Sequence, residues 1–444
     1  MTGLQRKALY AMFLAGFIAS APAVVLYTAG WRVDWAGGGL VQAGLISASS
    51  VPRGADVSVD GKPREARTPA VIDDLIPGEH LLSLGRPGYL PWEKALPVES
   101  RLTTFAPDVL LYLDEAPQRP LMIAPLAVSE PARGKFAYTL ESGGWRETWV
   151  NEPEAGATRM LSRMSSASSA ALTLEWSADA AWLAVRTNAA VGERITLIHD
   201  GDGKSIAVSD AAPTATAGWW DPNDPDRFFV RGPRGIFAMD LPDPAPKPVS
   251  KTAVAAVGSG NDLVLVEQQK DGVSVVSHAD DLPFTLGTLP DGEYEFLPAP
   301  SGAGLLRDRR TGTLWTFDPA DARGNGLIEL GTAVAWAWHG RSLLFSDGYD
   351  LVLYEADRRT QTVLTRVSAP IRHVAWHPSG STVLFVRDTT VSALELDDRG
   401  GRIETALMEG TGLGLPWIDD RARTMYLYAT VGGEPGLYAR ALQR

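Results

Sequence analysis

The sequence predicts an all-β protein in which one N-terminal transmembrane helix precedes a small β-sandwich and a β-propeller. Three observations predict this fold class. An uncharged apolar run of 24 residues lies near the start of the chain. Short apolar segments separated by Gly, Pro and Asp follow it, as is typical of strands and turns. From Gln118 onward a pattern recurs about every 40 residues, which indicates a repeat architecture.

Charge and cysteine content exclude several classes of function. The 444 residues include 53 acidic and 41 basic side chains, which gives a formal net charge of −12. Nucleic acids attract proteins with an excess of Lys and Arg, so the acidic excess argues against a nucleic-acid partner. The sequence has no cysteine, which excludes disulfides, thiolate metal sites and cysteine nucleophiles. The compartment therefore has to be inferred from membrane topology.

Residues 8–31 predict a transmembrane helix. A helix of 24 residues, at about 1.5 Å per residue, is long enough to cross a hydrocarbon core of about 30 Å. Arg6 and Lys7 precede the run, whereas the charges that follow it cancel. Because positive charge is retained in the cytoplasm, we expect residues 1–7 to be cytoplasmic and the domains after the helix to be extracytoplasmic.

A cleaved signal peptide is the alternative to an uncleaved anchor. Ala21-Pro22-Ala23 resembles a signal-peptidase site, and cleavage there would release the protein from the membrane. The apolar run continues past this site through residues 24–27, which is longer than a cleaved signal usually carries. The sequence therefore favours the anchor.

A small β-domain is predicted over residues 44–114, after a glycine-containing linker at residues 32–43. Residues 45–51 read as one strand. Val57 and Val59 alternate with polar neighbours, which is the period-two pattern of a half-buried strand. Turn-forming Gly and Pro residues separate these strands from those that follow.

A set of turn and aliphatic residues has a characteristic order in this segment: Pro52, Gly54, Ala55, Val57, Val59, Asp60, Gly61, Thr68, Pro69, Leu75, Pro77, Gly78, Glu79, Gly88 and Tyr89. In this order and spacing the segment resembles the PEGA domain, a small surface β-sandwich module of prokaryotes. The tetrad that gives the family its name is not intact, since it reads Pro77-Gly78-Glu79-His80. The resemblance implies a structural or adhesive module and carries over no catalytic residue.

Residues 118–444 repeat a unit of several short strands, whose first strand ends near a marker residue. The clear markers are Trp176, Trp220, Trp338, Trp376 and Trp417, and weaker ones lie near Val128, Val257 and Pro298. A period near 40 residues with four strands per unit is typical of a β-propeller, and the pattern resembles TolB-like and WD40-like propellers. Such a likeness implies fold rather than function. Eight markers favour eight blades, and seven remain open because the first unit is faint.

The last repeat ends after its third strand, at residues 437–442. We expect residues 119–123, from the other end of the domain, to supply its fourth strand and so close the ring. Such closure would also cover the edges of the sheet.

No residue is assigned as catalytic, cofactor-binding or metal-binding. Residues 308–312 with Trp315 resemble the tryptophan-docking repeat of quinoprotein propellers, but the motif occurs once here rather than around the ring. Asp-rich segments at residues 200–203 and 221–226 offer oxygen ligands of the kind Ca²⁺ takes. Neither has the spacing of a known calcium loop, so we expect them to be solvated turns.

Two further candidates are weak. His373 and His377 lie about 13 Å apart if they share an extended strand, which is too far for one metal ion unless the turn folds back. The regular marker tryptophans indicate blade packing. The less regular ones are candidates for surface contact with a ligand: Trp145, Trp149, Trp219 and Trp336.

These observations predict a membrane-anchored, extracytoplasmic binding or scaffold protein rather than an enzyme. Its partner would be a protein or a cell-envelope glycan, and no cofactor is expected. One alternative is an enzyme or cofactor protein that uses the central channel, which clustered charges at the channel mouth would favour. Another is a cleaved, soluble periplasmic accessory protein of the TolB kind.

Overall fold

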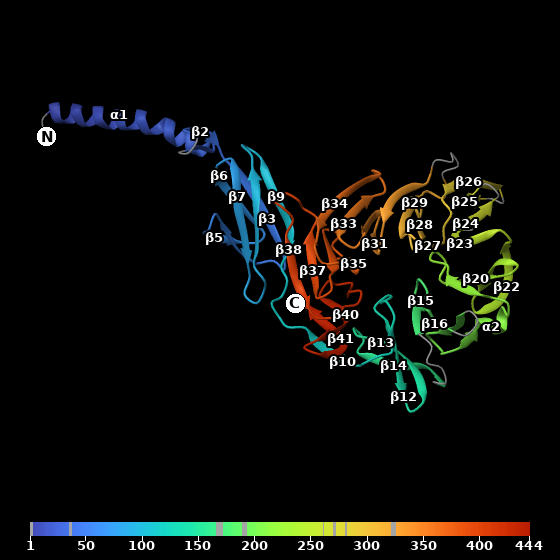
Figure 1. Cartoon of the computed structure of the whole chain (residues 1–444). Helices are drawn as coiled ribbons and strands as arrows, with labels where there is room; N and C mark the ends of the chain where they lie inside the picture. Colours follow the sequence, from blue (N-terminus) through green and yellow to red (C-terminus); the bar gives the residue numbers. More distant parts are fainter. Residues whose placement is uncertain are drawn as a thin grey trace. The chain divides into compact units, whose positions relative to one another are not determined.

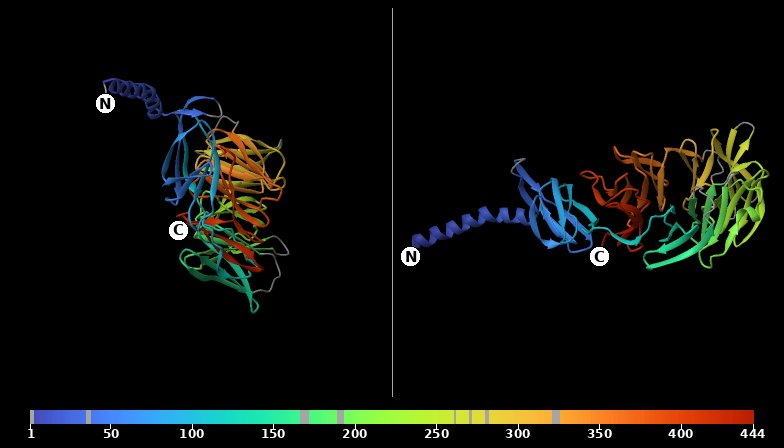
Figure 2. Two further views of the ribbon diagram at one scale, coloured as in Figure 1. Left: turned by 90° about the vertical axis from the view of Figure 1, so that its left-hand side faces the viewer. Right: turned by 60° about the horizontal axis from the view of Figure 1, so that its bottom comes forward.

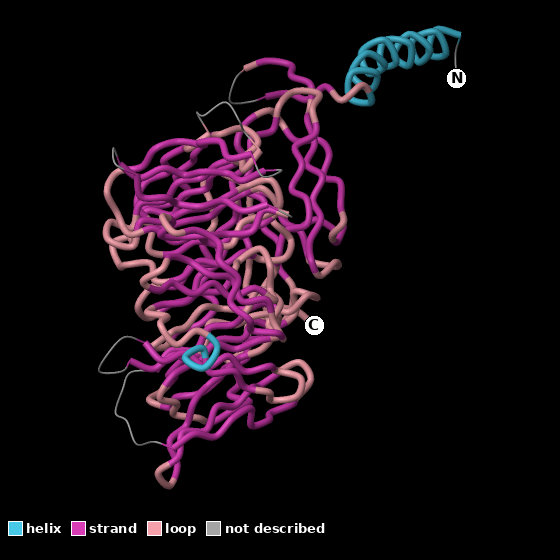
Figure 3. Tube along the Cα trace, turned by 90° about the vertical axis from the view of Figure 1, so that its right-hand side faces the viewer, coloured by secondary structure: helices cyan, strands magenta, loops and turns pink. Residues whose placement is uncertain are grey.

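The computed structural model describes residues 3–34, 38–165, 172–188, 193–260, 262–269, 272–279, 282–320 and 326–444. These residues are mostly strand, and their helices are one long N-terminal helix and one short helix, α2 (Val208–Ala211) (Figure 3). The chain divides into two compact units. Unit 1 contains Met1–Ala116, Glu395–Ile403 and Ala441–Arg444, and unit 2 contains Pro117–Leu394 and Glu404–Arg440.

Helix α1 (Gly3–Thr28) contains the stretch Leu9–Thr28, which has a mean hydropathy of 2.0 and the length to span a membrane. None of this stretch is buried inside the protein, so its apolar side chains are available to an apolar solvent. The predicted helix end at residue 31 was wrong. Gly30 has a φ of 82°, a left-handed conformation that ends helices, and the chain continues as a strand.

The predicted linker at residues 32–43 contains a short hairpin instead. Strand β1 (Trp31–Asp34) pairs antiparallel with β2 (Gly39–Gln42). Trp31 and Val33 are aromatic and β-branched residues of the kind that favour strands. The segment therefore forms a strand pair although glycines lie next to it.

Unit 1 contains a two-sheet sandwich after the hairpin. One sheet has the order β6-β3-β9 and the other the order β5-β4-β7-β8. Apolar side chains from both sheets fill the space between them, among them Ile46, Val57 and Leu82, which are almost completely buried. The ribbons of these strands are the blue region that follows the helix in Figure 2. The strands are β3 (Gly44–Val51), β4 (Asp56–Val59), β5 (Lys62–Arg67), β6 (Ala70–Leu75), β7 (Gly78–Gly85), β8 (Trp92–Val98) and β9 (Thr103–Leu110).

Two segments that are distant in sequence complete unit 1. The amide of Leu113 donates to the carbonyl of Leu442 at 2.9 Å, and Leu442 is fully buried. Lys94, on β8, is also buried, and its Nζ lies 3.1 Å from a carboxylate oxygen of Glu395 and 2.8 Å from the carbonyl of Asp397. The small sandwich therefore depends on residues that the chain supplies only near its end.

The Asp397 carboxylate stays ionised at this site. Burial acts to raise its pKa, but hydrogen bonds from the side chain and backbone of Arg399, together with the charge of Lys94, outweigh that effect and lower the pKa to about 2. The Arg399 guanidinium also donates to the carbonyl of Phe105 at 2.7 Å. Lys94 is therefore matched by a permanent negative charge.

Removing the buried cation should destabilise unit 1. We expect Lys94→Ala to lower the free energy of unfolding by about 3 kcal/mol, because Glu395 and Asp397 lose their partner in a partly buried place. Denaturant titration of the full chain in detergent measures this loss. Lys62→Ala, on the exposed strand β5, is the matched control and should cost less than about 0.5 kcal/mol. A loss below about 1 kcal/mol for Lys94→Ala would contradict a buried ion pair.

Unit 2 has the topology of a β-propeller. In the described part of the chain it forms eight four-stranded antiparallel sheets, whose first strands lie toward the middle of the ring and whose fourth strands lie at the rim (Figure 1). The first four sheets are β11 (Ala127–Val128), β12 (Phe136–Ser142), β13 (Trp145–Glu152) and β14 (Ala157–Ser165); β15 (Leu172–Trp176), β16 (Trp182–Asn188), β17 (Glu193–His199) and β18 (Ser205–Ala207); β19 (Ala217–Trp220), β20 (Arg227–Gly232), β21 (Gly235–Asp240) and β22 (Asp243–Ser250); and β23 (Ala253–Ser259), β24 (Asp262–Gln269), β25 (Gly272–Ala279) and β26 (Leu282–Leu289).

The remaining sheets continue this order along the chain. They are β27 (Tyr294–Leu297), β28 (Gly304–Asp308), β29 (Thr313–Phe317) and β30 (Ile328–Thr332); β31 (Ala335–His339), β32 (Ser342–Ser346), β33 (Asp350–Glu355) and β34 (Thr360–Arg366); β35 (His373–Trp376), β36 (Thr382–Val386), β37 (Thr390–Glu395) and β38 (Glu404–Glu409); and a last sheet of β39 (Trp417–Ile418), β40 (Thr424–Val431), β41 (Glu434–Ala441) and β10 (Gln118–Met122).

The expected ring closure is confirmed. Strand β10 pairs antiparallel with β41, with Leu121 opposite Leu437, so the outermost strand of the last sheet comes from the start of the repeat region. The turn between β11 and β12 meets the last sheet as well. A Cβ on Gly134, which has a φ of 78°, would lie 3.0 Å from the ring of Trp417, so this approach requires glycine.

Three of the five marker tryptophans, Trp176, Trp220 and Trp376, bond to the preceding sheet, in agreement with the predicted role in blade packing. The indole Nε1 of Trp176 donates to Ser129 Oγ at 3.0 Å, that of Trp220 to the Glu175 carbonyl at 3.2 Å, and that of Trp376 to the Ala337 carbonyl at 3.0 Å. In each case the acceptor lies in or next to the first strand of the preceding sheet. Burial differs, because Trp176 and Trp220 are buried whereas Trp376 is only partly so.

Truncating two markers should show this difference in burial. We expect Trp220→Ala to cost about 3–5 kcal/mol, because it removes a buried aromatic ring that packs edge-on against Phe228. Trp376→Ala should cost about 1–3 kcal/mol, since part of its ring already faces water. Thermal unfolding of the full chain compares the two. Equal costs for both variants would show that burial does not set the contribution of the markers.

Candidate functional site

The first strands of the sheets surround a central cavity of about 700 Å³ in unit 2. It is lined by residues from β15, β19, β27, β31 and β35 and by the turn after β11. Successive side chains of a strand point to opposite faces, so a first strand can anchor one residue in the packed sheets and present the next to the cavity. In β15, for example, Trp176 is buried while the adjacent Glu175 is exposed.

The cavity lining contains charged side chains of both signs. The carboxylates are Glu130, Glu175 and Glu295, and the basic side chains are Arg133, Arg307, Arg372 and His373. Most of these groups are paired. Arg186 donates to Glu175 at 2.6 Å, Arg307 to Glu295 at 2.6 Å, and Arg372 to Asp388 at 2.9 Å. Such pairs fix the orientation of the charged groups and neutralise their charge in the absence of a ligand.

Glu130 differs from the other cavity carboxylates. It lines the cavity and its side chain is exposed to solvent. Burial raises the pKa of its carboxyl group, the negative charge of Glu175 raises it further, and the positive charge of Arg307 only partly opposes these effects. The ionised form of Glu130 is therefore less stable in the folded protein than in water.

Glu130→Gln should stabilise the protein at neutral pH. Because folding raises the pKa of this carboxyl above its usual value near 4.5, the folded state loses stability as the pH rises from that value through the folded-state pKa. Glu130→Gln has no carboxyl group to ionise, so it does not lose stability in this pH range. We expect it to melt at a higher temperature than the parent at pH 8 and at the same temperature near pH 4.

Glu141→Gln is the matched control for this measurement, because Glu141 is exposed on β12 outside the cavity. Its melting temperature should follow that of the parent at both pH values. A parallel offset of Glu130→Gln at both pH values would contradict the assignment of the effect to ionisation.

Two of the less regular tryptophans, Trp219 and Trp336, lie in the cavity lining. Trp219 donates from Nε1 to the Ala256 carbonyl at 3.3 Å and stacks on Phe229. The guanidinium carbon of Arg307 lies 4.4 Å from the ring centroid of Trp336, within cation–π range.

The other two less regular tryptophans lie on β13 and do not line this cavity. Trp145 is exposed and lies 5.0 Å from the Arg163 guanidinium carbon, and Trp149 donates to Glu147 at 3.3 Å. The cavity lining therefore contains one pair of the surface-aromatic candidates, and the other pair lies on β13, the third strand of its sheet.

The structure assigns different environments to His373 and His377. His373 lines the cavity, and burial followed by the charge of Arg372 lowers its pKa. His377 is buried in the turn after β35, where its Nδ1 lies 2.8 Å from Ser379 Oγ and burial lowers its pKa to about 4. Within the described ranges no group of three or more His, Asp or Glu side chains is arranged to hold a metal ion.

One aspartate in each Asp-rich segment is buried and is held by groups of the protein. Asp200 accepts a hydrogen bond from Lys135 at 2.6 Å and also pairs with Arg159. Asp221 is fully buried and accepts from the Gly258 amide at 2.9 Å, which joins it to β23 of the next sheet. The expectation of solvated turns was therefore wrong for these two aspartates.

The segment at residues 308–312 is a turn held by its own aspartate. Asp308 accepts hydrogen bonds from the amides of Glu293 and Arg310, both at 3.0 Å, and from the Thr311 hydroxyl. Trp315 is buried and packs edge-on against Tyr294. In this chain the motif stabilises one sheet.

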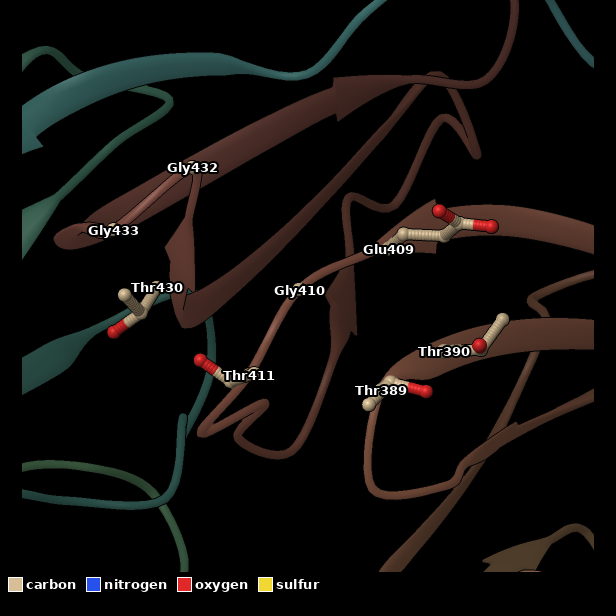
Figure 4. Close-up of a pocket in the computed structure, with 8 residues that line it drawn as sticks. All are labelled: Thr389, Thr390, Glu409, Gly410, Thr411, Thr430, Gly432 and Gly433. Atoms are coloured by element: carbon tan, nitrogen blue, oxygen red, sulfur yellow. The ribbon is translucent and has the colours of Figure 1, made fainter.

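A second hollow, of about 370 Å³, lies beside the last two sheets. Figure 4 shows that its hydroxyls come from separate segments, with Thr389 and Thr390 at the start of β37 and Thr430 near the end of β40. Its one ionisable lining group is Glu409, and no aromatic ring lines it. The central cavity is larger and combines charges with indole faces, so it is the better candidate site.

Reasoning from sequence missed the charged residues of the cavity. Glu175 directly precedes a marker tryptophan, and Glu130 follows the faint marker Val128 by two residues. A charged side chain in or just after an otherwise apolar first strand is the signal that would have identified them, because burial in a propeller sheet would leave such a charge unsatisfied.

Comparison with known proteins gives one family match, the PEGA domain, over residues 43–109. No curated protein matches the chain. Among solved structures, Sqt1 from Saccharomyces cerevisiae has a TM-score of 0.46 and 9% identity and aligns over 74% of this chain and 99% of its own. A chain in the Mitotic Checkpoint Complex has a TM-score of 0.40 and 12% identity, over 74% and 94% respectively. The propeller assignment rests on the sheet topology itself.

Proposed function

We propose that this protein is a membrane-anchored binding protein that presents a propeller on the extracytoplasmic side of a membrane. The helix α1 supplies the anchor, since its apolar stretch is exposed along its length and is preceded by basic residues. The PEGA match supports a location outside the cell, because modules of this kind are surface modules. The binding site is the central cavity.

The cavity lining is the observation that carries this proposal. It combines indole faces with charged groups of both signs, and each of Glu175, Glu295 and Arg372 is held by a fixed partner. Aromatic rings beside oriented charges are typical of recognition sites, where the rings supply contact area and the charges supply specificity.

Acid–base catalysis in the same cavity is the second candidate. The environment raises the pKa of Glu130, whereas Arg186 holds the neighbouring Glu175 in an ion pair, and two carboxylates with different environments suit an acid and a base. Substrate turnover that disappears in both Glu130→Gln and Glu175→Gln would favour the enzyme. Ligand binding without turnover favours the binding protein.

The anchor is testable in a bacterial host. We expect the full chain to stay in the membrane pellet after an alkaline carbonate wash, and a chain that begins at residue 30 to be released. Protease added to spheroplasts should degrade the propeller, because the basic residues ahead of the apolar stretch Leu9–Thr28 keep only the N-terminus inside. Release of the full chain by carbonate would indicate a cleaved signal, and protection from protease would reverse the orientation.

A further inference from the structure

The hairpin of β1 and β2 has two faces of different character. In an antiparallel pair, residues directly opposite each other have side chains on the same face, and successive residues of a strand alternate between the faces. Val33 lies opposite Leu40, so these two share a face with Trp31, two residues before Val33. Gln42, opposite Trp31, is the polar member of this face. Arg32 belongs to the other face.

The face of Arg32 is held against the protein. Its Nη1 donates to the carbonyls of Tyr27 at 2.8 Å and Trp31 at 2.9 Å, and its guanidinium carbon lies 3.9 Å from the centroid of the Tyr27 ring. Its Nη2 pairs with Asp74 on β6. One side chain therefore joins the last turn of α1, the hairpin and the sandwich.

The opposite face of the hairpin is apolar and exposed. Val33 is 46% exposed and Leu40 is 52% exposed. Two exposed aliphatic side chains are ordinary on a protein surface when water surrounds them. These two differ because of where the chain places them.

The length of the chain places this face at the membrane surface. Leu9–Thr28 has 20 residues, which as a helix have a length of about 30 Å, the thickness of the hydrocarbon core. Trp31 comes three residues later, so it lies at most about 10 Å farther along the chain. The headgroup layer extends about 5–8 Å beyond the hydrocarbon. The hairpin therefore begins in or beside this layer, and Arg32 holds it there.

We propose that the hairpin face formed by Trp31, Val33 and Leu40 lies in the lipid interface and makes a second contact with the membrane that α1 spans. Indole rings favour this layer, and aliphatic side chains gain free energy when they leave water for it. Arg32 is the one basic residue of the two strands and is paired with Asp74, so the contact does not depend on anionic headgroups.

This inference rests on the proposed anchor and adds to it. A single helix restrains the distance between a domain and the membrane, whereas a helix and a neighbouring hairpin also restrain the tilt of that domain. The partner of the hairpin is the lipid surface itself. The sandwich of unit 1 would thus have one orientation on the membrane.

The test uses the full chain in phospholipid nanodiscs with single fluorescent labels, which the absence of cysteine allows. The environment-sensitive fluorophore NBD is attached to Val33→Cys or Leu40→Cys. Lipids with a nitroxide near the headgroup quench labels in the interface, and iodide quenches labels in water. Val363→Cys is the matched control, because Val363 is an aliphatic residue on β34 of unit 2 that is 54% exposed.

We expect the shallow nitroxide to quench the labels at positions 33 and 40 at least about twofold more than the label at 363, because interfacial side chains lie about 5–10 Å into the membrane surface. Iodide should show the reverse order. Equal quenching of positions 33, 40 and 363 by both quenchers would overturn the inference.

A label in the helix separates this inference from the anchor on which it rests. Phe17 lies within the apolar stretch and is exposed, so Phe17→Cys should be quenched by a nitroxide near the bilayer centre. Quenching there, together with a label at position 40 that behaves like the one at 363, would keep the anchor and refute the interfacial hairpin. A water-exposed label at position 17 would refute both.

Lipid charge distinguishes the proposed apolar contact from electrostatic attraction. Replacing part of the phosphatidylcholine by phosphatidylglycerol should leave the quenching at positions 33 and 40 unchanged, because the hairpin face is uncharged. Quenching that requires phosphatidylglycerol, or that disappears at high salt, would identify an electrostatic contact and overturn the inference.

Discussion

The pairing of β10 with β41 is the constraint on which the rest of the propeller depends. It places Leu121 opposite Leu437 and so makes both ends of the repeat region parts of one sheet. The hydroxyl of Tyr428 strengthens the same junction by donating to the Ile123 carbonyl at 2.9 Å. Once the ends are joined, each first strand has a fixed place around the middle, and the side chains that line the cavity are determined.

In the proposed function, one set of strands serves both packing and recognition. Tryptophans such as Trp220 contact the preceding sheet, and the side chains next to them in sequence face the opening. The position of Glu130 costs stability, since burial and then the charge of Glu175 raise the pKa of its carboxyl group. Sites of binding commonly retain groups that folding alone would not select.

The sequence reveals features that repeat and hides features that occur once. The 40-residue period could be predicted from recurring tryptophans such as Trp176 and Trp376, because each blade packs against its neighbour in the same way. The missing outer strand could be predicted from residues 119–123. The hairpin at β1 and β2 was missed, since Gly30 ends the helix by a backbone conformation that glycine content alone does not specify. The partners of Asp221 and Lys94 were also invisible, because they lie far away in the sequence.

The three-part construction of unit 1 has a consequence for biosynthesis. Its sandwich strands leave the ribosome early, yet Glu395, which pairs with buried Lys94, and Leu442, which pairs with Leu113, are made only after nearly all of the propeller. The module nearest the N-terminus thus acquires its full set of contacts last. Until Glu395 and Asp397 have been made, Lys94 lacks these counter-charges, and a ribosome-bound or truncated chain presents an incomplete module that quality-control proteases can distinguish from the mature protein.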